Sequence, residues 1–182
     1  MRPAELFRFC PRCGAPRASE NVGQIPLRCG PCGFTFFFNP TVAAAAWVFD
    51  AEGRVLLIRR AKEPAKGKFG IPGGFLDIGE TAEDGLRREV REEVGLEIER
   101  VQFLMSCPNM YPYREVTYPV LDLVFTGVAV RPEEAKPLDG VAGIEWKHPA
   151  DVDPDELAFP SMKVSLAALR EGRGGELSQP GG

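Results

Sequence analysis

A stretch rich in carboxylates, GGFLDIGETAEDGLRREVREEVGL at residues 73–96, contains five glutamates, two aspartates and three arginines. On a helix, Glu92 and Glu93 follow Glu89 by three and four residues, so these three side chains share one face. Like charges at this spacing destabilise an isolated helix, whereas a hard cation such as Mg²⁺ prefers oxygen ligands. The spacing therefore favours a metal site that could act on phosphates. A solvated helix whose glutamates pair with its own arginines is the alternative.

The helix that carries these carboxylates is predicted over residues 82–94. Leu86, Val90 and Val94 recur every four residues and form an apolar stripe, which would pack the helix on a sheet. Gly85 lies on the carboxylate face, and a glycine inside a helix costs about 1 kcal/mol relative to alanine. We therefore expect Gly85 to clear space for another group.

The same stretch resembles the signature of the Nudix hydrolase family at every specified position. Five residues separate Gly74 from Glu80, seven more separate Glu80 from Arg88, and the sequence from Arg88 onward is REVREEVGL. The lead-in KGKFGIPGGFLDIGET also looks like that of the family, and the resemblance covers about residues 41–170. It implies an α/β fold, specifically an α/β/α sandwich with a mixed sheet.

The resemblance also implies a reaction, the hydrolysis of a nucleoside diphosphate linked to another group, with Mg²⁺ or Mn²⁺ bound. Matched by position, the catalytic and metal-binding carboxylates would be Glu89, Glu92 and Glu93. Glu89 is also the candidate base that positions or deprotonates water, and Arg88 would orient it. Glu80 would act on the metal indirectly, through water or a salt bridge. Gly74 would bring a backbone carbonyl close to the metal.

A further acidic ligand from a late loop is common in the family. The loop RPEEAKPLDG at residues 131–140 offers Glu133, Glu134 and Asp139. We favour Asp139 for its position ahead of the predicted strand that holds Trp146, although all three side chains could equally be solvated.

Four cysteines form a second constellation near the N-terminus. They make two Cys-x2-Cys pairs separated by fifteen residues, namely Cys10, Cys13, Cys29 and Cys32. The spacing is that of a four-thiolate zinc site, which is structural rather than catalytic. Iron in the same site and a site that no longer binds metal are the alternatives. We predict a small zinc ribbon over residues 1–38; nucleic-acid binding by it is left open but not favoured.

A zinc ribbon ahead of a Nudix domain resembles the NADH pyrophosphatase branch of the family. The marker of that branch is only partly matched, by SCPNMYPYR at residues 106–114. Tyr111 and Tyr113 are candidates for stacking on a nucleotide base, and Phe69 in the lead-in is a further candidate for substrate binding. The implied substrates are NADH, NAD⁺ or ADP-ribose, cleaved to AMP and the other phosphorylated half. Removal of a nucleotide cap from RNA, or non-catalytic nucleotide or nucleic-acid binding, are the alternatives.

The rest of the chain supplies the elements that would position these groups. Strands are predicted at residues 41–49, 54–60, 96–106, 118–130 and 142–148, and a last helix at residues 161–172. The segment CPNMYPYREV between the third and fourth strands is predicted to be irregular. We expect a Nudix domain over residues 39–172 and a disordered tail over residues 173–182, because the composition of the tail is that of disorder.

Overall composition limits the class of partner. The net charge is −4, so no global basic field points to nucleic acid or to a membrane surface. The sequence has no apolar run of about 18 residues, and residues 1–10, MRPAELFRFC, lack the apolar core expected of a secretory signal. We therefore predict a cytoplasmic protein that does not act on membranes, with a small nucleotide as its substrate and a homodimer as an open possibility.

Overall fold

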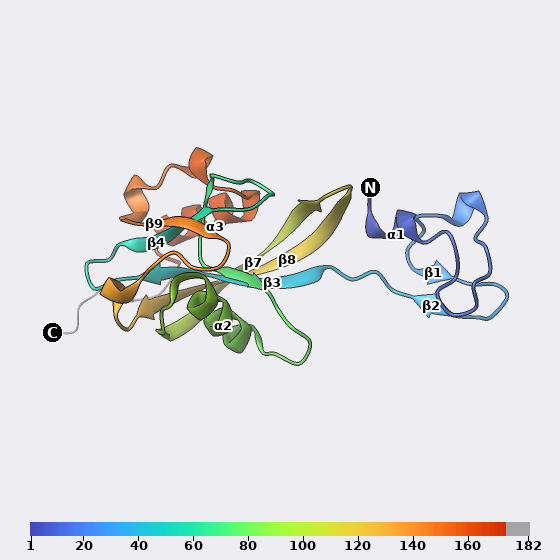
Figure 1. Ribbon diagram of the computed structural model, residues 1–182, viewed down its shortest axis with the longest axis horizontal. Coiled ribbons are helices and arrows are strands. Elements are labelled where there is room, and N and C mark those ends of the chain that lie inside the picture. Colours follow the sequence, from blue (N-terminus) through green and yellow to red (C-terminus); the bar gives the residue numbers. More distant parts are fainter. Residues whose placement is uncertain (174–182) are drawn as a thin grey trace. The chain divides into compact units, whose positions relative to one another are not determined.

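The computed structural model describes residues 1–173, and the chain divides into two compact units (Figure 1). The first unit holds Met1–Thr41 together with Met110–Val120, and the second holds Val42–Asn109 and the chain from Leu121 onward. The predicted domain limits, 1–38 and 39–172, stay a prediction. The predicted disordered tail falls, apart from its first residue, outside the described residues.

The largest structural element is a seven-stranded sheet with the strand order β5-β4-β3-β8-β7. In addition, β6 pairs with β3, and β9 pairs with β4. Its strands are β3 (Thr41–Phe49), β4 (Val55–Arg60), β5 (Phe69–Gly70), β6 (Gly73–Phe75), β7 (Ile98–Tyr113), β8 (Val116–Ala129) and β9 (Val141–Lys147). The two longer helices are α2 (Ala82–Val94) and α3 (Pro160–Arg170).

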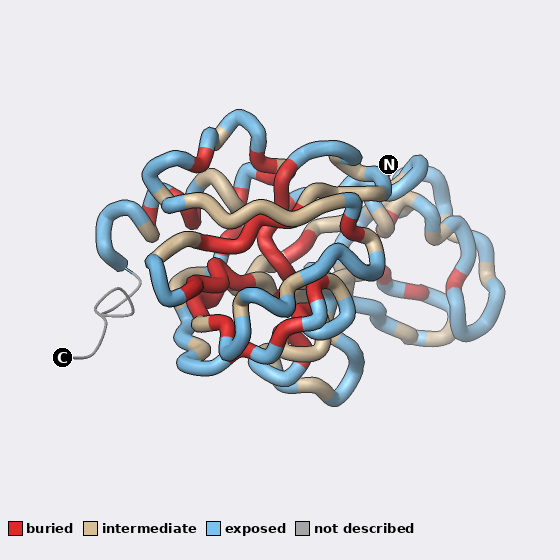
Figure 2. The backbone as a smooth tube through the Cα atoms, turned by 60° about the vertical axis from the view of Figure 1, so that its left-hand side comes forward, coloured by how far each residue is buried: buried red, intermediate tan, exposed pale blue. Residues whose placement is uncertain are grey.

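The two helices lie on opposite faces of the sheet, each over its own apolar cluster (Figure 1). Val90 of α2 packs in one cluster and Leu166 of α3 in the other. The central strand β3 serves both clusters, because Val48 faces α2 and Trp47 faces α3. The buried residues of the unit that contains the sheet gather in its middle, and the exposed residues lie on the outer segments (Figure 2).

The short strands β5 and β6 lie where β3 and β4 separate. Phe49 of β3 pairs with Val55 of β4, and further back along β3 Ala44 pairs with Gly74 of β6. Gly73 has a φ of 146°, and a Cβ there would lie 2.2 Å from the carbonyl oxygen of Ala44. Only glycine fits at this position, so its small size is what lets the segment join the central strand.

The β7–β8 hairpin differs from the prediction, which made residues 107–116 irregular. Both strands continue to a tight turn at Arg114, whose φ is 52°. Pro108 and Pro112 suggested a break, but β7 is the last strand in the sheet order, where a missing N–H disrupts no ladder on the outer side. Buried Cys107 and Asn109 alternate with exposed neighbours, which is the strand pattern that the prolines obscured.

The remaining elements are short. The first unit contains α1 (Pro3–Leu6), β1 (Leu27–Arg28) and β2 (Thr35–Phe36). Single turns of 3₁₀ helix lie at Ser19–Asn21, Pro132–Glu134, Pro149–Asp151 and Pro154–Glu156. Within residues 1–173, no helix is long and apolar enough to cross a membrane.

Candidate active site and metal centre

The helix α2 begins and ends as the sequence predicts. At its start the Thr81 hydroxyl oxygen accepts a hydrogen bond from the Asp84 backbone N–H at 3.1 Å. At its end Gly95 adopts a φ of 72°, and its N–H donates to the Arg91 carbonyl oxygen. Leu86, Val90 and Val94 are completely buried, so the predicted apolar stripe anchors the helix on the sheet.

Glu89 occupies space that only a glycine leaves open. A Cβ on Gly74 would lie 2.5 Å from the Glu89 Cδ atom and 2.6 Å from both carboxylate oxygens. Gly74 is held in register by its pairing with Ala44 of β3. The Glu89 side chain is 17% exposed, and burial raises its pKa, although Arg88 acts in the opposite direction. The carboxylate therefore lies directly against the backbone of β6.

Glu93 is the most deeply placed of the three glutamates. Its Oε2 accepts a hydrogen bond from the Gly73 N–H at 2.9 Å. Burial raises its pKa to about 8, and the neighbouring charge of Glu89 adds to the effect, whereas the Gly73 N–H and the Arg60 guanidinium oppose it. The protein thus supplies little compensation for an anionic Glu93. Buried carboxylate oxygens of this kind fit a hard divalent cation.

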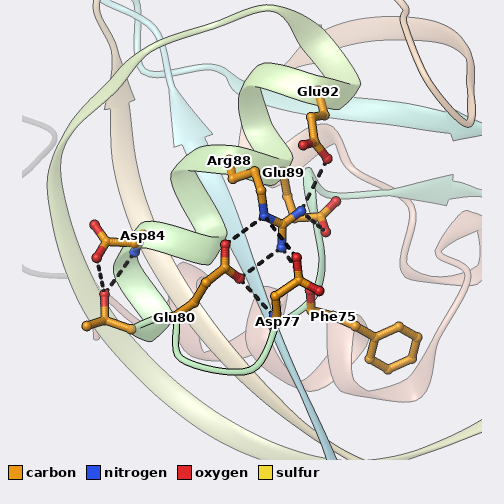
Figure 3. A network of polar contacts seen from close by, with 8 residues as sticks. Phe75, Asp77, Glu80, Asp84, Arg88, Glu89 and Glu92 are labelled. Atoms are coloured by element: carbon orange, nitrogen blue, oxygen red, sulfur yellow. Dashed lines mark hydrogen bonds and ion pairs between the residues drawn. The ribbon is translucent and has the colours of Figure 1, made fainter.

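Arg88 links the carboxylates of the site (Figure 3). Its Nε and Nη2 donate to the two carboxylate oxygens of Glu80 at 2.7 and 3.0 Å. Its Nη1 donates to Glu89 at 2.8 Å and to Glu92 at 3.2 Å, and its Nη2 also donates to the Phe75 carbonyl oxygen at 3.1 Å. The structure therefore brings together the predicted positioning residue, Arg88, and the carboxylate that it was predicted to orient.

Glu80 is a firmly ionised member of this network. Hydrogen bonds from Arg88, together with one from the Asp77 backbone N–H, lower its pKa to about 2. The space predicted above Gly85 is taken up by Glu80 and Leu76, because a Cβ on Gly85 would lie 2.8 Å from a Glu80 oxygen and 2.4 Å from the Leu76 Cδ2 atom. The expectation that Gly85 clears space is confirmed.

The late loop docks on the end of α2 through its backbone. The N–H groups of Leu138 and Asp139 donate to the carbonyl oxygens of Glu93 at 2.9 Å and Glu92 at 3.3 Å. The Asp139 side chain is 82% exposed and pairs with Lys62 at 3.0 Å. The loop thus brings Asp139 to the carboxylate end of the helix, and metal binding by Asp139 stays a prediction.

The four cysteines come together as predicted. Among the described residues, they are the only group of three or more metal-binding side chains whose ligand atoms all lie within 4.8 Å of one another. The Sγ atoms of Cys10 and Cys32 are 3.8 Å apart, and those of Cys13 and Cys29 are 3.7 Å apart. A tetrahedron with Zn–S bonds of about 2.3 Å has sulfur atoms about 3.8 Å apart, so the donor set fits zinc.

The two cysteine knuckles have the same local build. Gly14 and Gly33 follow the second cysteine of each pair with φ values of 71° and 70°. Their N–H groups donate to the carbonyl oxygens of Cys10 and Cys29, each at 2.9 Å. Burial raises the pKa of Cys10, but backbone N–H groups of Cys13 and Arg12 and the thiols of Cys29 and Cys13 together lower it to about 6. The hydrogen bond from the Cys32 N–H lowers the pKa of Cys29, but burial and the neighbouring thiols outweigh it and raise that pKa to about 12.

The three predicted substrate-binding aromatics belong to different compact units. Phe69 is 2% exposed and packs in the α3 cluster, with the guanidinium carbon of Arg59 4.1 Å and the Lys147 Nζ 4.7 Å from its ring centroid. Tyr111 and Tyr113 belong to the compact unit that contains the cysteines. Substrate binding by these three residues stays a prediction. The sequence pattern did not identify Gly73 as the hydrogen-bond donor to Glu93, although its position next to Gly74 pointed to the same site.

Replacement of Gly74 by alanine is expected to lower turnover by about 10-fold or more without unfolding the protein. The new methyl group would displace the Glu89 carboxylate, and a misplacement of about 1 Å can cost about 10²-fold in rate. Steady-state kinetics with a thermal melt would test this. Gly143→Ala, at a glycine of β9 without a positive φ whose Cβ would meet nothing within 4 Å, is the control. Unchanged turnover by the Gly74 variant would contradict the expectation.

Comparison with known proteins agrees with this geometry. The NUDIX domain pattern matches residues 39–169. The chain is 30% identical over 160 residues to an NAD-capped RNA hydrolase of Chromobacterium violaceum, covering 88% of this chain and 55% of that protein. It is 35% identical over 112 residues to a mitochondrial NAD(P)H pyrophosphatase of Homo sapiens, covering 62% and 31%. It is 36% identical over 92 residues to an ADP-ribose pyrophosphatase of Methanocaldococcus jannaschii, covering 50% and 53%.

Solved structures give the same fold. A NUDIX hydrolase of Nitrosomonas europaea superposes with a TM-score of 0.68 at 22% identity, covering 92% of this chain and 95% of that chain. A MutT NUDIX hydrolase of Burkholderia pseudomallei gives 0.63 at 25% identity, covering 72% and 98%. The predicted α/β/α sandwich is confirmed. The chain spans only about half, or less, of the length of the three curated relatives.

Proposed function

Because this chain belongs to the Nudix family, which its match over residues 39–169 shows, we propose that it hydrolyses the pyrophosphate bond of a nucleoside diphosphate derivative. The preferred substrate is a dinucleotide such as NADH or NAD⁺, or ADP-ribose, and the products are AMP and the other phosphorylated half. The observation that carries the proposal is the Glu89 carboxylate held in the space left by Gly74. The names of three relatives support the substrate class.

The glutamates of α2 are assigned to a site for Mg²⁺ or Mn²⁺. Glu89, Glu92 and Glu93 supply carboxylate oxygens, the Gly74 carbonyl is a further ligand, and Asp139 is the late-loop candidate. The bound cation would neutralise the pyrophosphate and lower the pKa of water. Glu89 accepts a proton from the attacking water, whose oxygen bonds to phosphorus as the anhydride P–O bond breaks. The leaving phosphate takes the bonding electrons.

Arg88 and Glu80 hold this arrangement without touching the substrate. The two-pronged bond between them fixes the guanidinium, which leaves Nη1 to fix the Glu89 carboxylate. Arg88 is therefore a positioning residue, and Glu80 positions Arg88 in turn.

The four-cysteine site is assigned to structural Zn²⁺. Four thiolates close the coordination shell, so no position is left for a substrate or water. The sulfur spacing of 3.7 to 3.8 Å supports this assignment over a site that has lost its metal. Zinc binding then stabilises the fold of the module that it crosslinks. A cytoplasmic location and a homodimer remain predictions.

Removal of a nucleotide cap from RNA is the second candidate function. It would break the same pyrophosphate bond, at an NAD-capped 5′ end rather than in a free dinucleotide. The likeness to an NAD-capped RNA hydrolase over 88% of this chain favours including it.

A substrate panel would test the proposal. NADH, NAD⁺, ADP-ribose, diadenosine polyphosphates, nucleoside triphosphates and NAD-capped RNA would be incubated with Mg²⁺ or Mn²⁺, with a metal-free control. We expect AMP from NADH, NAD⁺ or ADP-ribose, and no turnover without a divalent cation. A hundredfold preference for nucleoside triphosphates would contradict the dinucleotide assignment. Binding without hydrolysis of any member of the panel would favour a non-catalytic module instead.

A further inference from the structure

A pocket with a volume of about 310 Å³ lies between the end of β4 and the 3₁₀ turn Pro154–Glu156. Its lining is formed by Arg59, Lys66, Gly67, Lys68, Phe69 and Glu156. The volume is at the lower end of the range of about 300–1,000 Å³ for small-molecule sites. The pocket can therefore take a ligand larger than a simple ion.

The pocket lies on the face of the sheet that α3 covers, whereas the metal-binding glutamates lie on α2. Phe69 packs in the α3 cluster. On β4, Leu57 packs in the same cluster and Ile58 in the α2 cluster, so Arg59 points to the α3 face, because side chains alternate along a strand. A ligand in this pocket would be held on the opposite face of the sheet from the carboxylate helix.

Both walls of the pocket are held by backbone hydrogen bonds. The turn between β4 and β5 is closed by the Gly67 N–H, which donates to the Arg60 carbonyl oxygen at 2.9 Å, and by the Arg60 N–H, which donates to the Lys68 carbonyl oxygen at 3.0 Å. Beyond the 3₁₀ turn, the Ala158 N–H donates to the Phe69 carbonyl oxygen at 2.8 Å. The pocket is thus formed before a ligand arrives, which reduces the entropy cost of binding.

Two ammonium groups in the lining have no directly bonded counter-ion. In the described part of the chain, neither Lys66 nor Lys68 forms an ion pair with a carboxylate within 4.0 Å, in contrast to other lysines. The Lys68 Nζ donates instead to the Asp155 backbone carbonyl oxygen at 3.0 Å. Glu156, the acidic residue of the lining, lies 4.0 Å from the Nζ of Lys147. Positive charge therefore exceeds negative charge in the lining.

The other carboxylates nearby are engaged with different partners. The Asp155 Oδ1 pairs with the Nζ of Lys163 at 2.8 Å. The Glu63 Oε2 accepts a hydrogen bond from the backbone N–H of Lys66 at 3.4 Å and forms no ion pair with the ammonium group among the described residues. An anionic ligand would accordingly meet unpaired cations in this pocket, and a lysine ammonium is a common partner of phosphate.

Arg59 adds a third cation, whose plane is fixed. Its Nη1 donates to the Gly67 carbonyl oxygen at 2.9 Å, and its Nη2 pairs with Glu145 at 3.0 Å. Its Cζ lies 4.1 Å from the centroid of the Phe69 ring, which is only 2% exposed. One face of the guanidinium thus lies on the ring, and the exposed part forms the surface that a ligand meets. A guanidinium held flat in this way can stack on a second planar ring.

We propose that this pocket is a binding site for a small phosphate monoester with a planar ring, such as a nucleoside monophosphate. The ammonium groups of Lys66 and Lys68 hold the phosphate, and the planar ring stacks on the guanidinium of Arg59. The inference does not rest on the proposed hydrolysis, because no group of the carboxylate site takes part in it.

Titration calorimetry with AMP, in buffer without added divalent cation, would test the site. Adenosine and ribose 5-phosphate, which lack the phosphate and the base, are the two comparison probes. We expect AMP to bind, and each comparison probe to bind at least about 10-fold more weakly, the scale of a lost charge-assisted hydrogen bond or a lost stacking contact. Equal binding of adenosine and AMP would overturn the inference, because the lysines would then have no role.

Substitution of the exposed lysines tests the assignment of residues. Lys66→Gln should weaken AMP binding by about 10-fold, and the double change with Lys68→Gln by about 100-fold. Lys136→Gln removes an exposed lysine outside the pocket and is the matched control, with an expected change of less than about 3-fold. A thermal melt of each variant would confirm that the fold is kept.

Glu93→Gln separates the pocket from the carboxylate site. Without a divalent cation, this change should alter AMP affinity by less than about 3-fold. If AMP affinity changed in the Glu93 variant and not in the Lys66 variant, the ligand would lie at the carboxylates and the inference would be wrong. Absence of AMP binding at millimolar concentration, or equal affinities of the Lys66 and Lys136 variants, would also overturn it. Failure of the proposed hydrolysis would leave these results unchanged, because none of them depends on turnover.

Discussion

Glutamine in place of Glu93 is expected to lower kcat for ADP-ribose by about 10²–10³-fold, the scale for loss of one key stabilising group in a transition state. The Gln side-chain oxygen can still accept the hydrogen bond from the Gly73 N–H, so the shape of the site is kept. What is lost is the negative charge at the most buried of the three carboxylates. Steady-state kinetics across a range of Mg²⁺ concentrations would measure the effect.

Stability should not fall in this variant. Burial raises the folded-state pKa of Glu93 to about 8. A carboxyl group with a raised pKa disfavours folding as the pH rises from its unfolded value toward its folded value. Glutamine removes that unfavourable term, so the melting temperature of the metal-free protein at neutral pH should be equal or higher. Glu83→Gln, exposed on the same helix, is the control. Near-normal turnover by the Glu93 variant would remove this residue from the metal site.

Serine in place of Cys29 is expected to weaken zinc binding by about 10²–10³-fold. Structural zinc sites bind with about 10–16 kcal/mol in small peptides, so one thiolate of four contributes about 2.5–4 kcal/mol. Because binding and folding are coupled in such modules, the segment around the cysteines should also lose protection from proteases. The α2 site lies in the other compact unit, so residual hydrolysis is expected.

Elemental analysis of the wild type and of two cysteine variants would check the zinc assignment. Elemental analysis should give one zinc per wild-type chain and much less in the Cys29 variant after dialysis against a weak chelator. Cys107→Ser changes a cysteine outside the four-thiolate cluster and should leave the zinc content intact. If wild-type protein purified from metal-replete cells contained no stoichiometric zinc, the zinc assignment would be wrong. Stoichiometric iron in that protein would identify iron as the metal of the site.

The local part of the site was predictable from the sequence. The spacing of Glu89, Glu92 and Glu93, the stripe that begins at Leu86 and the glycine at position 85 all act within one helix, whose period is fixed. The structure agrees with the sequence on the bounds of this helix and on the stripe. The two cysteine pairs were equally clear, since each forms one short knuckle.

The rest of the site depends on pairing between distant segments. The hydrogen bond from Gly73 to Glu93 arises only because β6 joins β3, about thirty residues earlier in the chain. The docking of the late loop on α2 depends likewise on a backbone hydrogen bond from Leu138 to Glu93, forty-five residues earlier in the chain. The β7–β8 hairpin was shortened in the prediction because prolines weaken a strand pattern, whereas an edge strand tolerates them. No local pattern encodes these relations.

The glycine pair of β6 has a consequence for how such a protein can evolve. Gly73 and Gly74 pair with the central strand β3 and contact Glu93 and Glu89. The positions of these two carboxylates therefore depend on the packing of the sheet. The tip of the β7–β8 hairpin clusters instead with the cysteine module. A mutation that adds a side chain at Gly73 or Gly74 would therefore be selected against for as long as the carboxylates are needed. Sequence change at the tip of the hairpin would leave the position of these carboxylates untouched.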